Sequence, residues 1–226
     1  MVVFQDKDWF GSLRTQNRPE LIKRRVQISP ADRELMLRYG QEYFDGALPF
    51  GYGGYHYDGR FAPIVRSMID HYLLNESSRV LDIGCAKGFL LYEFYRHGIP
   101  QVFGLDISDY AIANVPQAVR NQCFVGTASD LSRWTDGFFD LVIAKDVLHN
   151  LVPEEADKAI KEIVRVCKGA KFVQPNSYVT EHQRRCLQAW VITIKTVRST
   201  QEWLNRFAEL GYDGDYHFLT FDHNLD

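Results

Sequence analysis

The sequence contains four cysteines but no C-x-x-C pair among them, and it contains no long run of apolar residues. It also lacks a charged-then-apolar leader at its start and any cluster with the residue spacing of a zinc site. These absences exclude a disulfide framework, a zinc-built domain and a membrane-spanning helix. We therefore expect a cytoplasmic protein with reduced thiols that binds neither a structural metal nor a membrane.

An overall excess of positive charge is absent too. The formal net charge is -3 and the isoelectric point is near 6.2, so no basic field favours nucleic acid. Basic residues exceed acidic ones only in two flanking segments: eight against five in residues 1–40, and five against two in residues 176–206. Ordinary solvated charge explains such flanks, but they favour an anionic small molecule if they face a site.

A complete dinucleotide-binding glycine pattern is the next absence. Residues Val80–Leu91 read V-L-D-I-G-C-A-K-G-F-L-L, which predicts a buried strand, a glycine turn and a helix N-terminus. Such a turn leaves backbone N–H groups and the helix dipole open to a ligand. However, its spacing is Gly84-x-x-x-Gly88, and Ala86 stands where G-x-G-x-x-G has its middle glycine. A pyrophosphate is therefore a poor match.

An acidic residue nevertheless follows the next predicted strand, as in nucleotide-binding sheets. Asp106, in Gly104-Leu105-Asp106, lies eighteen residues beyond Gly88. A carboxylate at this place can accept hydrogen bonds from both hydroxyls of a ribose. A ribose site without a pyrophosphate site indicates a nucleoside ligand.

Strand and helix patterns alternate through most of the chain. Apolar runs predict strands at 79–83, 101–106, 122–126, 139–145 and 170–174, and helical periodicity predicts helices at 63–74, 88–97, 109–118 and 154–167. Helices at 181–190 and 199–210 follow, then a final strand at 216–221 that we expect to pair antiparallel at the sheet edge; residues 191–197 are ambiguous. This order predicts an α/β fold with a doubly wound, Rossmann-like, mostly parallel sheet.

The first sixty residues do not follow this alternation. A helix is expected from Ser29-Pro30, and residues 43–61 then hold five glycines and seven aromatics in nineteen positions. That composition opposes a regular helix, yet its aromatic rings need a surface to lie against. A lid over a ligand explains both features; a connector whose tyrosines fill the core is the alternative. We expect a helical extension and lid at 1–62 and the main domain at 63–226.

The motifs together resemble those of class I S-adenosylmethionine-dependent methyltransferases. D-x-G-C-x-x-G follows the first predicted strand, G-L-D ends the second, and F-D-L-V-I-A forms the fourth. The segment Y-F-D-G … G-Y-G-G-Y-x-Y-D-G-R and the closing W-x-x-x-F-x-x-x-G-Y-x-G-D-Y-x-F resemble a bacterial subgroup that acts on small molecules. The resemblance implies S-adenosylmethionine as cofactor and S-adenosylhomocysteine as product.

The resemblance also implies a role for individual residues. Asp82 would hold the cofactor's amino group, Asp106 the ribose hydroxyls and Asp130 the adenine amino group, with Lys145 beside the sulfonium. The cofactor-binding residues implied in this way are Asp82, Gly84, Cys85, Ala86, Gly88, Asp106, Ile107, Ala128, Ser129, Asp130 and Lys145. Cys85 has no neighbour in the sequence that would activate a thiol, so we interpret its side chain as packing.

Fewer sequence patterns indicate which residues bind the methyl acceptor. His149 follows the fourth strand, where it is placed to act as a general base, or alternatively to hydrogen-bond a loop. Asn150 beside it is placed to orient the acceptor. The lid adds four further candidates for acceptor binding: Tyr52, Tyr55, Tyr57 and Arg60.

One more absence narrows the acceptor. Enzymes of this class that methylate nucleic-acid amino groups carry an (Asp/Asn/Ser)-Pro-Pro-aromatic turn after the fourth strand, where this chain has Lys145-Asp146-Val147-Leu148. We therefore expect methyl transfer to an oxygen of a small polar acceptor: a sugar, a nucleotide sugar or a phosphorylated metabolite. The alternatives are N-methylation of an amino sugar or amine, and a non-catalytic module that binds S-adenosylmethionine; a nicotinamide oxidoreductase is disfavoured by the missing third glycine.

Overall fold

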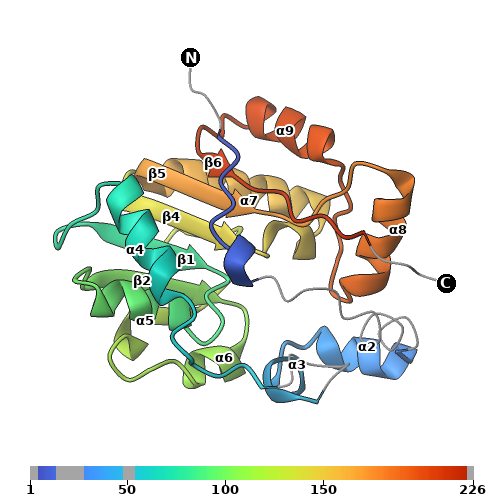
Figure 1. Cartoon of the computed structure of the whole chain (residues 1–226), viewed down its shortest axis with the longest axis horizontal. Helices are drawn as coiled ribbons and strands as arrows, with labels where there is room; N and C mark the ends of the chain where they lie inside the picture. Colours follow the sequence, from blue (N-terminus) through green and yellow to red (C-terminus); the bar gives the residue numbers. More distant parts are fainter. Residues whose placement is uncertain (1–4, 14–27, 48–53, 223–226) are drawn as a thin grey trace.

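A six-stranded sheet with the order β3-β2-β1-β4-β5-β6 forms the centre of the molecule (Figure 1). The computed structural model describes residues 5–13, 28–47 and 54–222. The strands are β1 Arg79–Ile83, β2 Gln101–Asp106, β3 Cys123–Val125, β4 Phe139–Lys145, β5 Cys167–Gln174 and β6 Asp215–Tyr216. All neighbouring strands pair in parallel, as expected for a doubly wound sheet.

Helices cover both faces of this sheet. Helices α4 (Ala62–His71), α5 (Phe89–Arg96) and α6 (Asp109–Ala113) lie on one face, and α7 (Pro153–Val166) and α9 (Thr200–Glu209) lie on the other. Side chains alternate along the strands, so Val80 joins the apolar cluster with α4 and α5, whereas Leu81 joins the cluster with α7 and α9. The two clusters explain why the central strands read as nearly continuous apolar runs.

The final strand corrects one expectation, because it runs parallel and not antiparallel to its neighbour. Phe172 and Val173 of β5 pair in parallel with Asp215 and Tyr216 of β6. Helix α9 returns the chain across the sheet between these two strands, and a crossover of this kind delivers the next strand in the same direction. The paired strand is also short, although a further parallel bridge joins Asn176 to Leu219.

The remaining elements agree with the sequence patterns at most positions. Helix α8 spans Glu181–Trp190, while α6 ends four residues after Asp109 and so is shorter than predicted. The ambiguous residues 191–197 form no strand. Among the described residues, no helix is long and apolar enough to cross a membrane.

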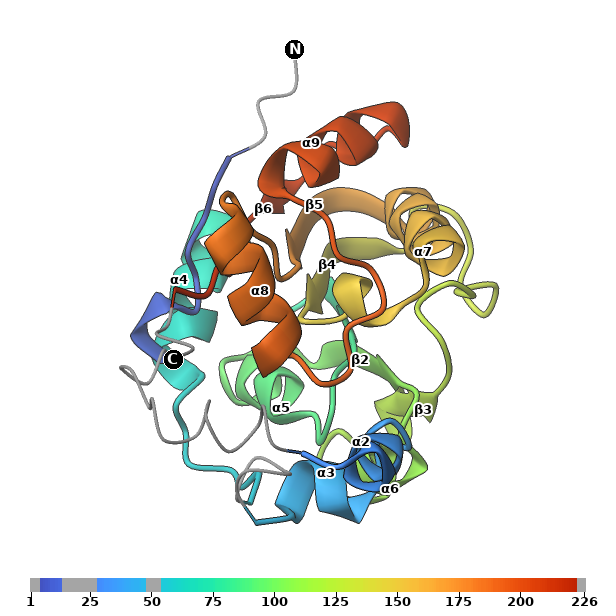
Figure 2. The same ribbon diagram turned by 90° about the vertical axis from the view of Figure 1, so that its right-hand side faces the viewer.

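The N-terminal elements lie away from the main layers. Helices α2 (Pro30–Met36) and α3 (Gln41–Asp45) sit beside α6, and α8 sits above them at the end of the sheet where the parallel strands finish (Figure 2). The 3₁₀ turn η1 (Gly11–Leu13) packs nearer the sheet. The end of the sheet that α2, α3 and α8 flank is the end that carries ligands in doubly wound folds.

Candidate functional site

The turn between β1 and α5 has the backbone of a ligand cradle. Gly84, Ala86 and Gly88 all have left-handed backbone angles, with φ of 73°, 50° and 66°. A Cβ atom on Gly84 would lie 2.2 Å from Cγ2 of Val147 in the loop after β4. Glycine is therefore required at position 84 for two reasons: its left-handed backbone angle and the close approach of the loop after β4.

Asp106 ties this turn to the end of β2. Its Oδ2 accepts a hydrogen bond from the Ala86 N–H at 2.8 Å, and its Oδ1 accepts one from the Ser108 N–H at 2.9 Å. The Ile107 N–H also donates to this carboxylate, so one of its four lone pairs is left for a ligand hydroxyl. The next residue, Ile107, is 60% exposed, which is unusual for a large apolar side chain at a sheet edge and suits an adenine face.

A second buried carboxylate, Asp82, lies in β1 close to Asp106 and Lys145. Burial, opposed by the charge of Lys145 and reinforced by that of Asp106, raises the pKa of Asp82 to about 8. A cationic amino group placed beside it would favour the ionised form. Asp82 is therefore suited to bind a positively charged ligand group.

Cys85 faces the interior and not the ligand side of the turn. Its side chain is 4% exposed and belongs to the cluster that contains Cys123. The hydrogen bond with Cys123, together with burial, raises the pKa of the Cys85 thiol well above its usual range. The thiol is protonated at neutral pH, in agreement with a packing role, and only the backbone of Cys85 is available to a ligand.

Asp45, at the end of α3, connects the N-terminal segment to the glycine turn. Lys87 Nζ lies 2.7 Å from both carboxylate oxygens, and the hydroxyl of Tyr110 in α6 and the N–H of Tyr55 also donate to them. Burial alone would raise the pKa of Asp45, but the hydrogen bonds from Lys87 and Tyr110 lower it. Sequence reasoning missed this pair, although Asp45 belongs to the Y-F-D-G motif and Lys87 to the turn itself.

The lid tyrosines occupy different places. The Tyr55 ring lies 5.0 Å from that of Phe89 at the start of α5, so it stays near the glycine turn. The Tyr57 hydroxyl donates to Glu93 and accepts from Arg96, both on α5. Tyr57 is thus held along the helix, which supports the connector interpretation for this residue.

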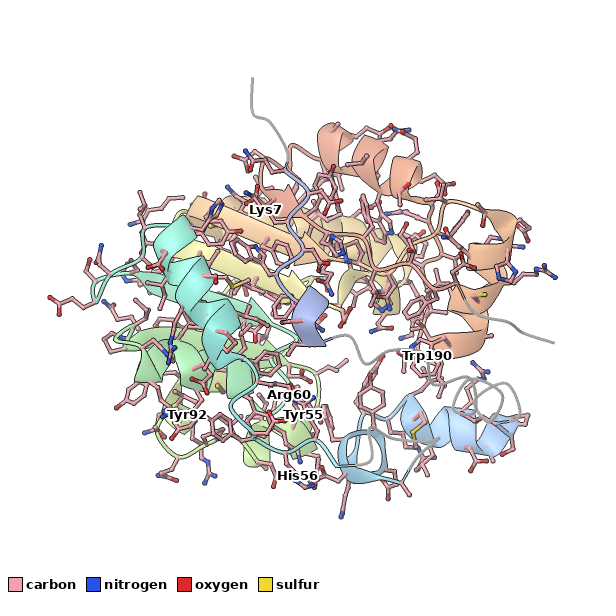
Figure 3. The ribbon with its side chains drawn as sticks, in the orientation of Figure 1. Lys7, Tyr55, His56, Arg60, Tyr92 and Trp190 are labelled. Carbon is pink, nitrogen blue, oxygen red and sulfur yellow. The ribbon has the colours of Figure 1, made fainter. Side chains whose placement is uncertain are left out.

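Of the other two lid candidates, Arg60 lies on the surface and Tyr52 lies outside the described ranges. Arg60 donates to both carboxylate oxygens of Asp58, and its side chain is exposed. Tyr55, His56 and Arg60 lie along one extended stretch beside α5 and Tyr92 (Figure 3). Tyr52 lies outside the described residues. The described lid candidates therefore have separate partners: Phe89 for Tyr55, α5 for Tyr57 and Asp58 for Arg60.

His149 is buried and both of its ring nitrogens are engaged. The Asn176 N–H donates to Nδ1 at 3.0 Å, so in a neutral imidazole the proton must reside on Nε2. The side-chain amide of Asn176 lies 3.0 Å from Nε2, and the proton there requires the amide's oxygen as its acceptor. Burial, which outweighs the opposing charge of Asp146, lowers the pKa of His149 to about 4. No ring nitrogen keeps a free lone pair, which favours the loop-fastening interpretation over the general base.

Asn150 fastens the same loop. Its Nδ2 donates to the Asp146 carbonyl at 2.9 Å, and its Oδ1 accepts from the Thr193 hydroxyl at 2.8 Å. The carbonyl of His149 also accepts from the N–H groups of Lys195 and Thr196. The segment 191–197 therefore stabilises the loop after β4 by hydrogen bonds. The side-chain amide of Asn150 already takes part in these hydrogen bonds.

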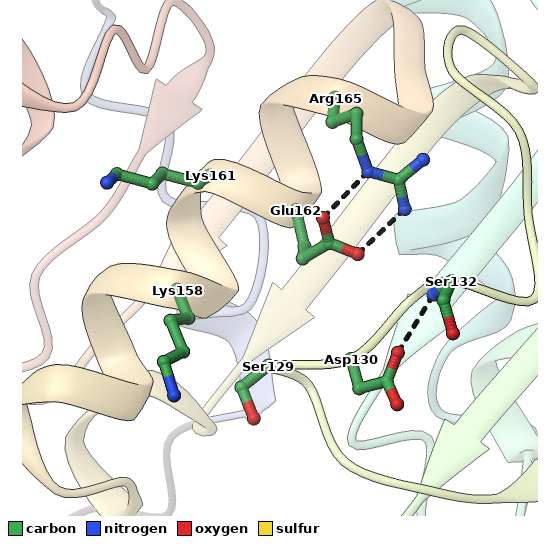
Figure 4. Close-up of a pocket in the computed structure, with 7 residues that line it drawn as sticks. All are labelled: Ser129, Asp130, Ser132, Lys158, Lys161, Glu162 and Arg165. Atoms are coloured by element: carbon green, nitrogen blue, oxygen red, sulfur yellow. Dashed lines mark hydrogen bonds and ion pairs between the residues drawn. The ribbon is translucent and has the colours of Figure 1, made fainter.

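The loop after β3 turns Asp130 toward α7. Asp130 Oδ1 accepts from the Ser132 N–H at 3.0 Å, and the hydrogen bonds to Ser132 lower the pKa of Asp130. Asp130 and Ser129 line an open surface hollow, and Glu162 and Arg165 of α7 pair across from them (Figure 4). Ala128, by contrast, is buried in the core. The contact of Asp130 with the adenine amino group stays a prediction.

The described residues contain no candidate metal position. Within residues 5–13, 28–47 and 54–222, no group of three or more His, Cys, Asp or Glu side chains is arranged to hold a metal ion.

Comparison with known proteins gives one family match. Residues 81–173 match the family described as "Methyltransferase domain". The ribosomal protein L11 methyltransferase of Thermotoga petrophila is 32% identical over 95 residues, which cover 41% of this chain and 34% of that protein. The chain thus spans about a third of the length of this curated relative.

Solved structures share the fold at low sequence identity. The YcgJ protein of Bacillus subtilis has a TM-score of 0.54 at 20% identity, with 65% of this chain and 66% of that one covered. The [4+2]-cyclase SpnF has a TM-score of 0.51 at 20% identity, with 66% and 56% covered. Because a fold hosts different reactions, these similarities establish the architecture alone.

Proposed function

We propose, from the match of residues 81–173 to the methyltransferase domain family, that this protein transfers the methyl group of S-adenosylmethionine to an oxygen of a small polar acceptor. The observation that carries the proposal is the nucleoside-shaped corner made by the left-handed glycine turn, Asp106 and the exposed Ile107. These groups suit a ribose partner and an adenine face, and Ala86 replaces the middle glycine of a pyrophosphate-binding turn.

The residues of this corner have separate tasks when the cofactor is bound. S-adenosylmethionine supplies an activated methyl group on a sulfonium, so no covalent intermediate with the protein is needed. Asp106 would hold the ribose hydroxyls, Ile107 would lie against the adenine, and Asp82 would hold the amino group. The protein's contribution to the rate is alignment of donor and acceptor and exclusion of water.

Calorimetry with S-adenosylhomocysteine tests the cofactor assignment. We expect binding by the wild-type protein and a loss of at least tenfold in affinity for Asp106→Ala. A wild-type protein that gives no binding, or an Asp106→Ala variant that binds equally well, would refute the assignment.

Product analysis separates the competing functions. Fragmentation mass spectrometry of the methylated product distinguishes an O-methyl from an N-methyl group. Tight binding of S-adenosylhomocysteine without methyl transfer to any acceptor pool would favour a non-catalytic binding module. The named activity of the Thermotoga relative makes ribosomal protein a necessary arm of that acceptor pool.

A further inference from the structure

Two polar side chains meet where β4 and β5 finish, next to the cofactor corner. Asp146 follows β4, and its N–H donates to the carbonyl of Gln174, the last residue of β5, at 2.9 Å. Lys145 is the register partner of Gln174 and forms an ion pair with Asp146. The charge of Lys145 also acts on Asp82, so this group borders the part of the cofactor corner assigned to the methionine end.

Gln174 presents a buried oxygen that lacks a hydrogen-bond donor. Gln174 is only 3% exposed and its Oε1 has no partner among the described residues, whereas its side-chain amide donates to the Asp146 carboxylate. An ionised carboxylate only accepts hydrogen bonds, so the Gln174 group that faces it is the amide nitrogen and Oε1 points elsewhere. A buried acceptor without a donor is unfavourable, and a bound ligand that supplies a donor removes this cost.

A third polar side chain nearby, that of Asn176, offers a hydrogen-bond donor and not an acceptor. The Asn176 amide nitrogen is placed against His149 Nε2, with Oδ1 unpartnered. Because Nε2 carries the proton, the amide must be turned over, which leaves its nitrogen without a partner among the described residues. Asn176 is 5% exposed and lies two residues beyond Gln174. The end of β5 therefore combines a free acceptor with a free donor.

This combination selects one chemical class of ligand. A phosphate or carboxylate offers only acceptor atoms and would be repelled by Asp146. An ammonium group would meet a carboxylate whose charge Lys145 already balances. Hydroxyl groups donate to Gln174 and Asp146 and accept from Asn176, so they satisfy all three. We propose that Asp146, Gln174 and Asn176 bind neighbouring hydroxyl groups of a neutral sugar or polyol acceptor, a conclusion that rests on the proposed methyl transfer.

The test compares acceptor classes and variants of Gln174. Tritiated S-adenosylmethionine is incubated with the protein and three panels: neutral monosaccharides and methyl glycosides, the matching sugar phosphates, and amino sugars. We expect transfer to members of the neutral panel. Gln174→Met keeps the shape of the side chain and removes both polar groups; it should lower kcat/KM for the neutral acceptor by at least tenfold and change S-adenosylhomocysteine affinity less than twofold. Gln188→Met, at an exposed position of α8, is the matched control.

The outcomes separate this inference from the proposed function. A wild-type protein that does not bind S-adenosylhomocysteine refutes the methyltransferase assignment. A protein that binds it but methylates no neutral acceptor, or methylates only the phosphate or amino panel, overturns the inference alone. An unchanged kcat/KM in the Gln174→Met variant overturns the inference as well. The Asp146→Asn variant is measured in the same assay.

Discussion

Lys87 and Asp45 form an ion pair that joins the cofactor turn to the N-terminal segment. Nζ of Lys87 lies 2.7 Å from both carboxylate oxygens, and the lysine side chain is only 7% exposed. The end of helix α3 is therefore fastened to the turn itself. This relationship makes the pair the first target for mutation.

Replacing Lys87 by methionine should weaken both folding and cofactor binding. Removal of the cation leaves the partly buried Asp45 carboxylate with its Tyr110 and Tyr55 donors alone, which we expect to cost about 1–3 kcal/mol of unfolding free energy. Thermal unfolding measures this cost, and calorimetry with S-adenosylhomocysteine measures the loss of affinity. Lys158→Met, which breaks an exposed pair with Glu155 on α7, is the control and should change stability by less than about 0.5 kcal/mol. Equal effects of the two variants would contradict a special role for Lys87.

The raised pKa of Asp82 predicts opposite effects of pH on folding and on cofactor binding. The pKa of Asp82 is about 8 in the folded protein and near 4 in the unfolded chain, so the folded state holds more protons between these values. The contribution of Asp82 to the unfolding free energy should therefore fall as pH rises from 4 to 8, by up to about 1.4 kcal/mol per pH unit. Asp82→Asn should lack this slope in urea titrations.

Cofactor binding should show the reverse dependence. A cationic amino group favours ionised Asp82, so binding below pH 8 releases a proton and affinity rises toward pH 8. Calorimetry of S-adenosylhomocysteine binding in two buffers with different ionisation heats measures this proton. The absence of proton release at pH 7 would show that the amino group does not lie beside Asp82.

His149 is expected to matter for stability more than for turnover. Because the pKa of His149 is about 4 in the fold and 6.5 in the unfolded chain, its contribution to stability is lost as pH falls from 6.5 to 4. His149→Gln should lower the unfolding free energy by about 1–3 kcal/mol through its lost hydrogen bonds. It should retain most of its kcat when measured well below its unfolding temperature. A fall in kcat of a hundredfold or more, with unchanged cofactor affinity, would restore the general-base interpretation.

Two substitutions in the glycine turn should have different effects. Gly84→Ala introduces a Cβ at a φ of 73° and against Val147, and we expect it to cost about 1–3 kcal/mol and to impair cofactor binding. Ala86→Gly relieves a left-handed alanine but adds freedom to the unfolded chain, so the net change should stay within about 0.5 kcal/mol. Denaturant unfolding of the two variants provides the comparison. A larger loss for Ala86→Gly would contradict it.

Most of the fold was predictable because its signals are local. The buried strands at 79–83, 101–106 and 139–145 have the bounds that their apolar runs predicted, and so does the helix at 181–190. The direction of the last strand was mispredicted, since it depends on which strand it pairs with and on the crossover through α9. That crossover was itself visible in the sequence as a helix before the strand, so the topological rule would have found the parallel pairing.

The site was predictable only in part, because partners distant in the chain decide what each side chain does. Asp106 was found from its distance to the glycine turn, and its contact with Ala86 follows from the parallel register. No local pattern indicates that Tyr57 lies along α5 or that Asn176 occupies both nitrogens of His149. The group at Gln174 was missed for the same reason, since an unpaired oxygen is a property of the folded structure alone.

The outer edge of β6 has a consequence for how the chain is made. The Tyr216 N–H donates to the Gln5 carbonyl, the Lys7 N–H donates to the Tyr216 carbonyl, and His217 pairs with Asp6, 211 positions away. A ribosome releases residues 5–7 long before residue 216 exists, so this segment stays without its partner while the residues between them are made. Until β6 has been made, the nascent chain presents an unpaired strand edge, which is the kind of surface that chaperones shield.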